Sequence, residues 1–123
     1  MGEIVVEFDY MKYDEVVTHV VANVKEGKFD FVNYTDDKID KAFGYRETIT
    51  EKDFNDFLEY RCFPKERANC KDILKGLGLE KVGYNPLSIV RITHGVMVHD
   101  RYWIRFKGEE NLVYEEVRKS LGL

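Results

Sequence analysis

Two cysteines and two of the three histidines are residue types that could hold a metal ion: Cys62, Cys70, His94 and His99. Structural zinc takes four such ligands on a tetrahedron, usually from closely spaced cysteine and histidine pairs. Four residues separate the histidines, which is within the zinc-finger range, but seven separate the cysteines and Pro64 lies between them. This spacing favours ordinary buried thiols over a zinc site, and we expect no cofactor.

His94, His99 and Asp100 could together form a general base whose imidazole is oriented by a carboxylate. However, no serine or cysteine nucleophile stands beside them in a sharp-turn motif. His94 also precedes Gly95, a position typical of a helix end, where an imidazole can bond the last carbonyl groups. We therefore favour a structural role for these residues over a small histidine-dependent hydrolase or nuclease.

Basic residues with interleaved aromatic ones are a third candidate site, typical of nucleic-acid binding. Against this, the isoelectric point is about 5.4, and Glu66 and Asp72 interrupt the basic run. A solvated helix face, with the basic side chains packed along their stems, is the favoured alternative. The basic residues are Arg61, Lys65, Arg67, Lys71, Arg91, Arg101 and Arg105, and the aromatic ones are Tyr102 and Trp103.

Alternation after Gly95 predicts a strand in which Arg101, Trp103 and Arg105 share one face. Tryptophan and arginine dominate binding hot spots, because they bury a large area and still bond at their edges. This face is therefore the best candidate for binding a partner protein. In the alternative, Trp103 is core and Tyr102 is exposed. The full predicted partner-binding set is Arg101, Trp103, Arg105, Arg67, Lys71 and Arg91.

The segments that must position these residues follow from periodicity. Residues 1–34 alternate in a way that predicts an antiparallel strand meander, although 14–24 also fits a helix; its β-branched residues favour the strand. Residues 49–95 predict helices, which begin at Thr50 and at Asn85-Pro86.

The carboxy-terminal part completes the predicted fold. Residues 96–107 predict a strand that returns to the sheet, and 111–121 predict a short helix. The sum is a single α+β domain over residues 1–123, with a small antiparallel sheet of about four strands and three to four short helices packed on one face.

Composition sets the remaining expectations. The chain is 44% hydrophobic and 14% aromatic, enough for a core, and it has no long apolar run or signal peptide. We therefore expect a cytoplasmic protein without a membrane segment. Residues 1–60 hold 15 acids and 7 bases, a net charge of −8, whereas residues 61–123 hold 8 acids and 12 bases, a net charge of +4. The acidic half could meet a basic partner.

Four stretches carry a resemblance to a known module. They are RCFPKERANCKDILKGLGL at 61–79, NPLSIVRITHG at 85–95, DRYWIRF at 100–106, and the turn Ala42-Phe43-Gly44. In order and spacing they resemble a module of clostridial and other Firmicutes mobile elements. It occurs there as small proteins or ahead of the kinase domain of HipA-like proteins. The resemblance implies a mobile-element or phage context. Kinase activity does not carry over, because 123 residues lack the catalytic loop and the metal site of a kinase.

These observations predict a non-enzymatic regulator from a mobile element or phage that binds a host or element-encoded protein. The resemblance suggests a HipA-like kinase toxin as its target, in the manner of a toxin–antitoxin pair. The charge asymmetry suggests instead an inhibitor that blocks a bacterial defence protein through an acidic surface. A nucleic-acid-binding regulator is the alternative class. The oligomeric state, including a homo-oligomer, is left open.

Overall fold

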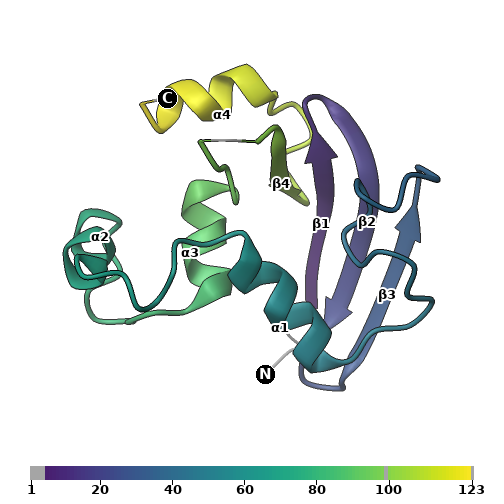
Figure 1. The fold of residues 1–123 in the computed structure, drawn as a ribbon, viewed down its shortest axis with the longest axis horizontal. Coiled ribbons are helices and arrows are strands. Elements are labelled where there is room, and N and C mark those ends of the chain that lie inside the picture. The colour runs from purple at the N-terminus through teal and green to yellow at the C-terminus, as the bar shows by residue number, and fades with distance from the viewer. Residues whose placement is uncertain (1–4, 99, 123) are drawn as a thin grey trace.

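The computed structural model describes residues 5–98 and 100–122, and its strands and helices follow one another in the predicted order (Figure 1). No helix in this part of the chain combines the length and the apolar character that crossing a membrane requires. The elements are β1 (Val5–Lys12), β2 (Glu15–Asn23), β3 (Lys28–Asn33), α1 (Glu51–Tyr60), α2 (Cys70–Gly76), α3 (Pro86–Thr93), β4 (Tyr102–Phe106) and α4 (Tyr114–Ser120).

The four strands form one antiparallel sheet in the order β3-β2-β1-β4. The ambiguous segment at 14–24 forms β2, as its β-branched residues predict. The return strand β4 pairs with β1, where Phe106 lies opposite Phe8 and Ile104 lies opposite Tyr10. The predicted α+β class and the four-stranded antiparallel sheet are confirmed.

One face of the sheet carries the larger core, which α1 and α3 cover (Figure 1). Phe8 of β1 stacks on Phe57 of α1, with 6.2 Å between ring centroids, and meets the Phe106 ring edge-on at 5.8 Å. Ile89 and Val90 of α3 are fully buried in the same core. A buried aromatic side chain removes about 150–250 Å² from water, so these rings provide much of the stabilisation.

The opposite face of the sheet is covered by α4, which lies beside the ends of β1 and β4 in Figure 1. Met11 and Trp103 project to this face and are fully buried against Tyr114 and Val117 of α4. The helices thus pack on both faces, whereas the sequence predicts them on one. The periodicity at 111–121 predicts the helix, but not the side of the sheet on which it docks.

Beyond α4 this second face is polar and carries linked ion pairs. His19 of β2 bonds two carboxylates of β1, with Nδ1 at 2.6 Å from Asp9 and Nε2 at 3.0 Å from Glu7. Arg105 binds the other oxygen of Asp9 at 3.2 Å, and Lys107 lies 3.5 Å from Glu7. Cross-strand pairs of opposite charge stabilise neighbouring strands, so these contacts join β4 and β2 through β1.

The starts of α1 and α3 have the predicted chemistry. Thr50 Oγ1 accepts a hydrogen bond from the amide of Asp53, whose carboxylate accepts one from the Thr50 amide. This capping box satisfies donors that the helix itself leaves open. At α3, the Asn85 side chain accepts from the Ser88 amide, and Pro86 is the first helical residue.

Candidate functional site

His94 and Asp100, two of the predicted catalytic residues, belong to different ion pairs. His94 is the left-handed residue that ends α3, and its Nε2 lies 3.0 Å from a carboxylate oxygen of Glu109. Asp100 instead receives two hydrogen bonds of 2.9 Å from Arg61. The structure thus does not join His94 and Asp100 as an imidazole and its orienting carboxylate. His99, the third predicted residue, lies outside the described residues.

The Arg61 side chain binds the loop between α3 and β4 from the interior of the protein. Its side chain is 1% exposed, and it donates to the carbonyl oxygens of Gly95 and Tyr102 as well as to Asp100. Gly95 has a φ of +64°, and an added Cβ would come within 3.1 Å of the Arg61 Cβ. The close approach and the left-handed backbone therefore both call for glycine at this position.

Of the predicted metal ligands, Cys62, Cys70 and His94 lie among the described residues and form no group that could hold a metal ion. Cys62 is buried and donates from Sγ to the carbonyl oxygen of Leu58, and burial raises the pKa of its thiol to about 12. Cys70 begins α2 and is half-buried. Within residues 5–98 and 100–122, no three His, Cys, Asp or Glu side chains are grouped so that they could hold a metal ion. Burial thus keeps the Cys62 thiol neutral at ordinary pH in this packing.

Trp103 does not lie on the exposed partner-binding face that the alternation of β4 had predicted. Its side chain is fully buried beneath α4, and its indole N–H donates to the carbonyl oxygen of Tyr13. Tyr102, on the other face of β4, is half-buried and packs against Tyr10 at 5.4 Å between ring centroids. Trp103 is therefore core, as in the alternative reading of the strand, and it cannot present its ring to a partner.

The predicted basic residues lie in separate surroundings. Arg101 lies over the Tyr13 ring, Arg91 of α3 lies over the Phe106 ring, and Arg105 binds Asp9 on the second face of the sheet. Arg67 and Lys71 are exposed near the start of α2. These five basic residues thus stand on β4 and its flank, on α3 and at α2. Three of them, Arg91, Arg101 and Arg105, are engaged with an aromatic ring or a carboxylate of the protein itself.

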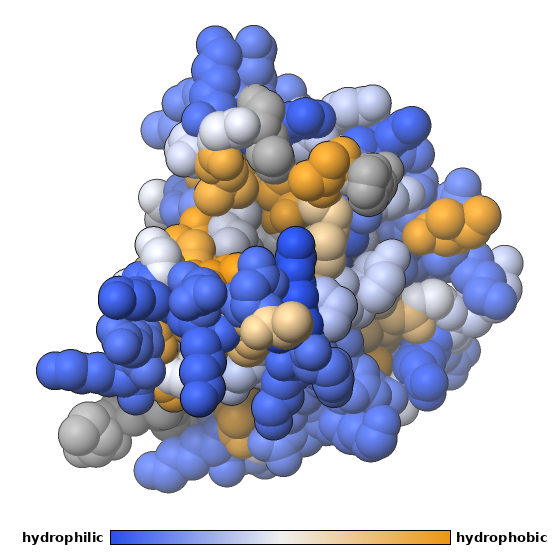
Figure 2. Space-filling model, turned by 60° about the vertical axis from the view of Figure 1, so that its left-hand side comes forward, coloured by the Kyte–Doolittle hydropathy of each residue, from blue (hydrophilic) through white to orange (hydrophobic). Residues whose placement is uncertain are grey.

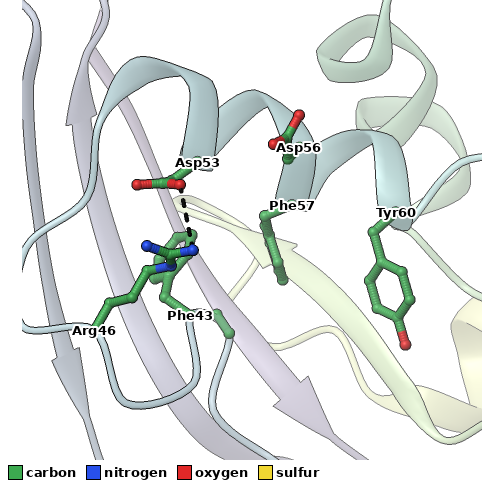
Figure 3. A pocket seen from close by; sticks show the side chains of 7 residues that line it. Phe43, Arg46, Asp53, Asp56, Phe57 and Tyr60 are labelled. Atoms are coloured by element: carbon green, nitrogen blue, oxygen red, sulfur yellow. Dashed lines mark ion pairs between the residues drawn. The ribbon is translucent and has the colours of Figure 1, made fainter.

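A hollow of about 290 Å³ lies between α1 and the turn around Phe43. Phe43 and Phe57 form its apolar floor, with 5.3 Å between ring centroids. Figure 3 shows Arg46 reaching Asp53 at one end, at 3.8 Å, and Tyr60 at the other end. The hollow is lined by Ala42, Phe43, Arg46, Asp53, Asp56, Phe57 and Tyr60.

A second hollow of about 530 Å³ continues from the first, because Asp56 and Tyr60 line both. We call the two together the α1 groove. Tyr60 between them is 66% exposed. Glu59 and Glu66 make no ion pair with any residue that the structure describes. The second hollow is lined by Asp56, Glu59, Tyr60, Cys62, Pro64, Lys65, Glu66 and Tyr84.

The α1 groove has an excess of negative charge. Its lining holds four carboxylates and two cationic groups, of Arg46 and Lys65. Asp53 pairs with Arg46, and Asp56 pairs with Lys52 beside the groove at 2.7 Å, so the excess of negative charge is carried by Glu59 and Glu66. The Arg61 guanidinium already lies 5.5 Å from the centroid of the Tyr60 ring. The neighbouring carboxylates add charge attraction for a further cation at this exposed ring. The sequence itself indicates this acidic face, because the acids at 53, 56 and 59 are three residues apart and so share one side of the helix.

A third hollow, of about 420 Å³, lies among the end of α1, α3 and the loop that follows α3. We call it the apolar cleft. Ile89, Val96, Met97 and Val98 are among the residues that line it, and Arg67 stands in its lining as the exposed charged residue. Figure 2 shows apolar side chains gathered in the upper half of the face that carries α2 and α3, between hydrophilic ones.

No family model matches the chain, and no curated protein or solved structure matches it either. The functional argument therefore starts from the geometry. Among the described residues, the predicted catalytic and metal-binding groups serve packing and ion pairs. The α1 groove and the apolar cleft are surface hollows suited to binding.

Proposed function

We propose that this protein is a non-enzymatic regulator that docks a basic segment of a partner protein in the α1 groove. The observation that carries the proposal is the pair of joined hollows, which hold three carboxylates and an exposed tyrosine along α1 and a fourth carboxylate, of Glu66, in the loop that follows it. Lysine and arginine side chains pair with carboxylates and stack on aromatic rings, so a basic segment fits both features.

The acidic half of the chain supports the same proposal. Asp53, Asp56 and Glu59 belong to residues 1–60, which carry a net charge of −8. A surface of one sign steers a partner of the other sign and disfavours competitors of like charge. Two targets remain proposals: a HipA-like kinase toxin, which the module resemblance suggests, and a bacterial defence protein, which the acidic surface suggests.

The test compares two double variants of equal charge in affinity capture from a bacterial lysate. Glu59→Lys with Glu66→Lys reverses the charge in the α1 groove, whereas Glu80→Lys with Glu116→Lys reverses two exposed acids elsewhere. We expect the groove variant to lose the partner that the wild type captures, and the control variant to retain it. Equal capture by both variants would remove the α1 groove from the interface.

A second experiment distinguishes the two targets. A purified HipA-like kinase is mixed with the protein, and its autophosphorylation is measured with the wild type and with the groove variant. A change in autophosphorylation that the wild type causes and the groove variant does not supports the kinase target. The defence protein is the target if the wild type leaves autophosphorylation unchanged but alters the efficiency of phage plating on a host that carries the defence protein.

A further inference from the structure

The two edges of the sheet differ in how their backbone groups are bonded. β4 forms one edge and β3 the other (Figure 1). At the β4 edge the amides of Tyr102, Ile104 and Phe106 donate to groups of the same chain, at 3.1, 2.7 and 2.9 Å. The acceptors are two carboxylates and one carbonyl oxygen, of Asp100, Glu109 and His94. The protein thus closes this edge itself.

The β3 edge is open. Directly after β3, the Tyr34 amide bonds the carbonyl oxygen of Val17 in β2 at 2.9 Å. Bonded and non-bonded positions alternate in an antiparallel pair, so the backbone groups of Phe29, Phe31 and Asn33 point away from β2. Within residues 5–98 and 100–122, no group bonds these outward N–H and C=O groups. Such an edge can pair with a further strand.

The side chains along this edge form two distinct faces. Phe29 and Phe31 pack against the larger core. The residues between and after them are exposed, including two apolar ones: Val32 is 53% and Tyr34 is 64% exposed. Exposed apolar side chains on an open edge strand are typical of a contact surface. A second copy of β3 has the same alternation, and antiparallel pairing sets each face opposite its own kind.

Charge and strand length select one register for two copies of β3. A two-fold axis at Asp30 would set two carboxylates directly opposite each other, which is destabilising. An axis at Phe31 pairs the whole strand and brings no like charges opposite. Axes nearer either end of β3 pair fewer of its residues. With the axis at Phe31 the opposite pairs are Asp30 with Val32, Phe29 with Asn33, and Lys28 with Tyr34, whose ring can receive the ammonium group.

On these grounds we infer that two copies of this chain associate through β3, antiparallel about a two-fold axis at Phe31. Their two sheets of four strands join into one sheet of eight. The outward backbone groups of Phe29, Phe31 and Asn33 then bond those of the second copy, as in other cases of strand addition. The inference is independent of the α1 groove, because no residue of β3 lines either of its hollows.

The test measures sedimentation equilibrium of the full chain over a concentration series up to millimolar, together with hydrogen exchange of the backbone amides. We expect a dimer that forms with rising concentration. The amides of Phe29, Phe31 and Asn33 should exchange slowly in the dimer and rapidly in the monomer. A monomer at every concentration would overturn the inference, and so would a dimer in which these three amides still exchange rapidly.

Substitutions at two exposed positions test the register. Val32→Asp sets a carboxylate opposite Asp30 of the second copy twice in each dimer, so we expect the dimer to dissociate about tenfold more readily. Val32→Lys sets opposite charges there and should dimerise at least as tightly as the wild type. Val82→Asp is the control, because Val82 is 59% exposed and lies between α2 and α3. It should leave the dissociation constant unchanged.

A double variant distinguishes the two central registers. Asp30→Lys combined with Val32→Asp restores opposite charges across an axis at Phe31, so it should recover the dimer that Val32→Asp alone weakens. With an axis at Asp30 the same double variant would set two lysines against each other and weaken the dimer further, which would overturn the proposed register. Equal dissociation constants for Val32→Asp, Val32→Lys and the wild type would remove β3 from the interface.

Discussion

Arg61 is 1% exposed, and its guanidinium donates to two backbone carbonyl groups and to the carboxylate of Asp100. A buried cation is tolerated only when partners of this kind replace its water. Arginine suits the position better than lysine because its planar fork can reach several acceptors at once. One side chain thereby ties the end of α1 to the loop that forms the wall of the apolar cleft.

Substitution of Arg61 should therefore be among the most destabilising changes at a charged residue. We expect Arg61→Met to lower the free energy of unfolding by about 3–5 kcal/mol, because Asp100 and two carbonyl groups lose their donor. Urea unfolding measures this, with Arg101→Gln as the exposed control, expected to change stability by less than about 0.5 kcal/mol. Equal stabilities of the two variants would contradict the assigned role.

His19 makes stability depend on pH. Its hydrogen bond to the carboxylate of Asp9 raises the pKa of the imidazole above its ordinary value, and the bond to Glu7 adds to this. A group whose pKa is raised on folding stabilises the folded state below its unfolded pKa. That contribution is then lost as pH rises through the folded pKa.

The corresponding prediction compares wild type with His19→Gln in urea unfolding at about pH 6 and about pH 9, where Asp9 and Glu7 are ionised in the unfolded chain. We expect the variant to be less stable at the lower pH by up to about 1 kcal/mol, as for a part-exposed ion pair. The difference should shrink at the higher pH, because His19 is then neutral in both states. A difference that stays constant with pH would rule out the charged pair.

At the scale of elements, α4 and β4 depend on each other. Trp103 is fully buried between β1 and α4, where it contacts Met11, Tyr114 and Val117. Without α4 this large apolar surface would face water, so the helix is part of the core rather than a terminal appendage. The same packing removes Trp103 from any contact surface.

Truncation of Trp103 tests this packing. We expect Trp103→Ala to lower the free energy of unfolding by about 3–5 kcal/mol, because it leaves a large cavity under α4. Tyr34→Ala, at an aromatic residue that is 64% exposed, should cost far less. Thermal unfolding followed by circular dichroism measures both. If Trp103→Ala is as stable as Tyr34→Ala, α4 does not cover the tryptophan in solution.

At the scale of the whole molecule, charge is distributed unevenly, and the α1 groove concentrates part of the acidic half on one surface. Such a surface acts over about 10 Å at moderate ionic strength. Partner capture should therefore weaken as sodium chloride rises from about 0.05 M to about 0.5 M, as screening shortens that range. The Glu80→Lys and Glu116→Lys control variant, which keeps the groove charges, should show the same salt dependence. Capture by the wild type that is insensitive to salt would indicate apolar contacts alone.

The sequence predicted local structure correctly where that structure depends on residues close together in the chain. The capping box at Thr50 and Asp53, the start of α3 at Asn85-Pro86 and the β-branched strand β2 all depend on residues a few positions apart. The class of fold followed from these elements. The face of β4 did not, because aromatic residues stand on both of its faces and alternation cannot say which face another element covers.

The amino-acid sequence by itself determined the elements, their order and the uneven charge, since these follow from propensity, periodicity and composition. Only the tertiary structure decided that Trp103 is core, that Asp100 belongs to Arg61, and that the hollows along α1 lie side by side. The reason is physical. Burial, ion pairing and cavities arise between residues that are distant in the chain, and their partners are fixed only when the sheet and its helices pack together.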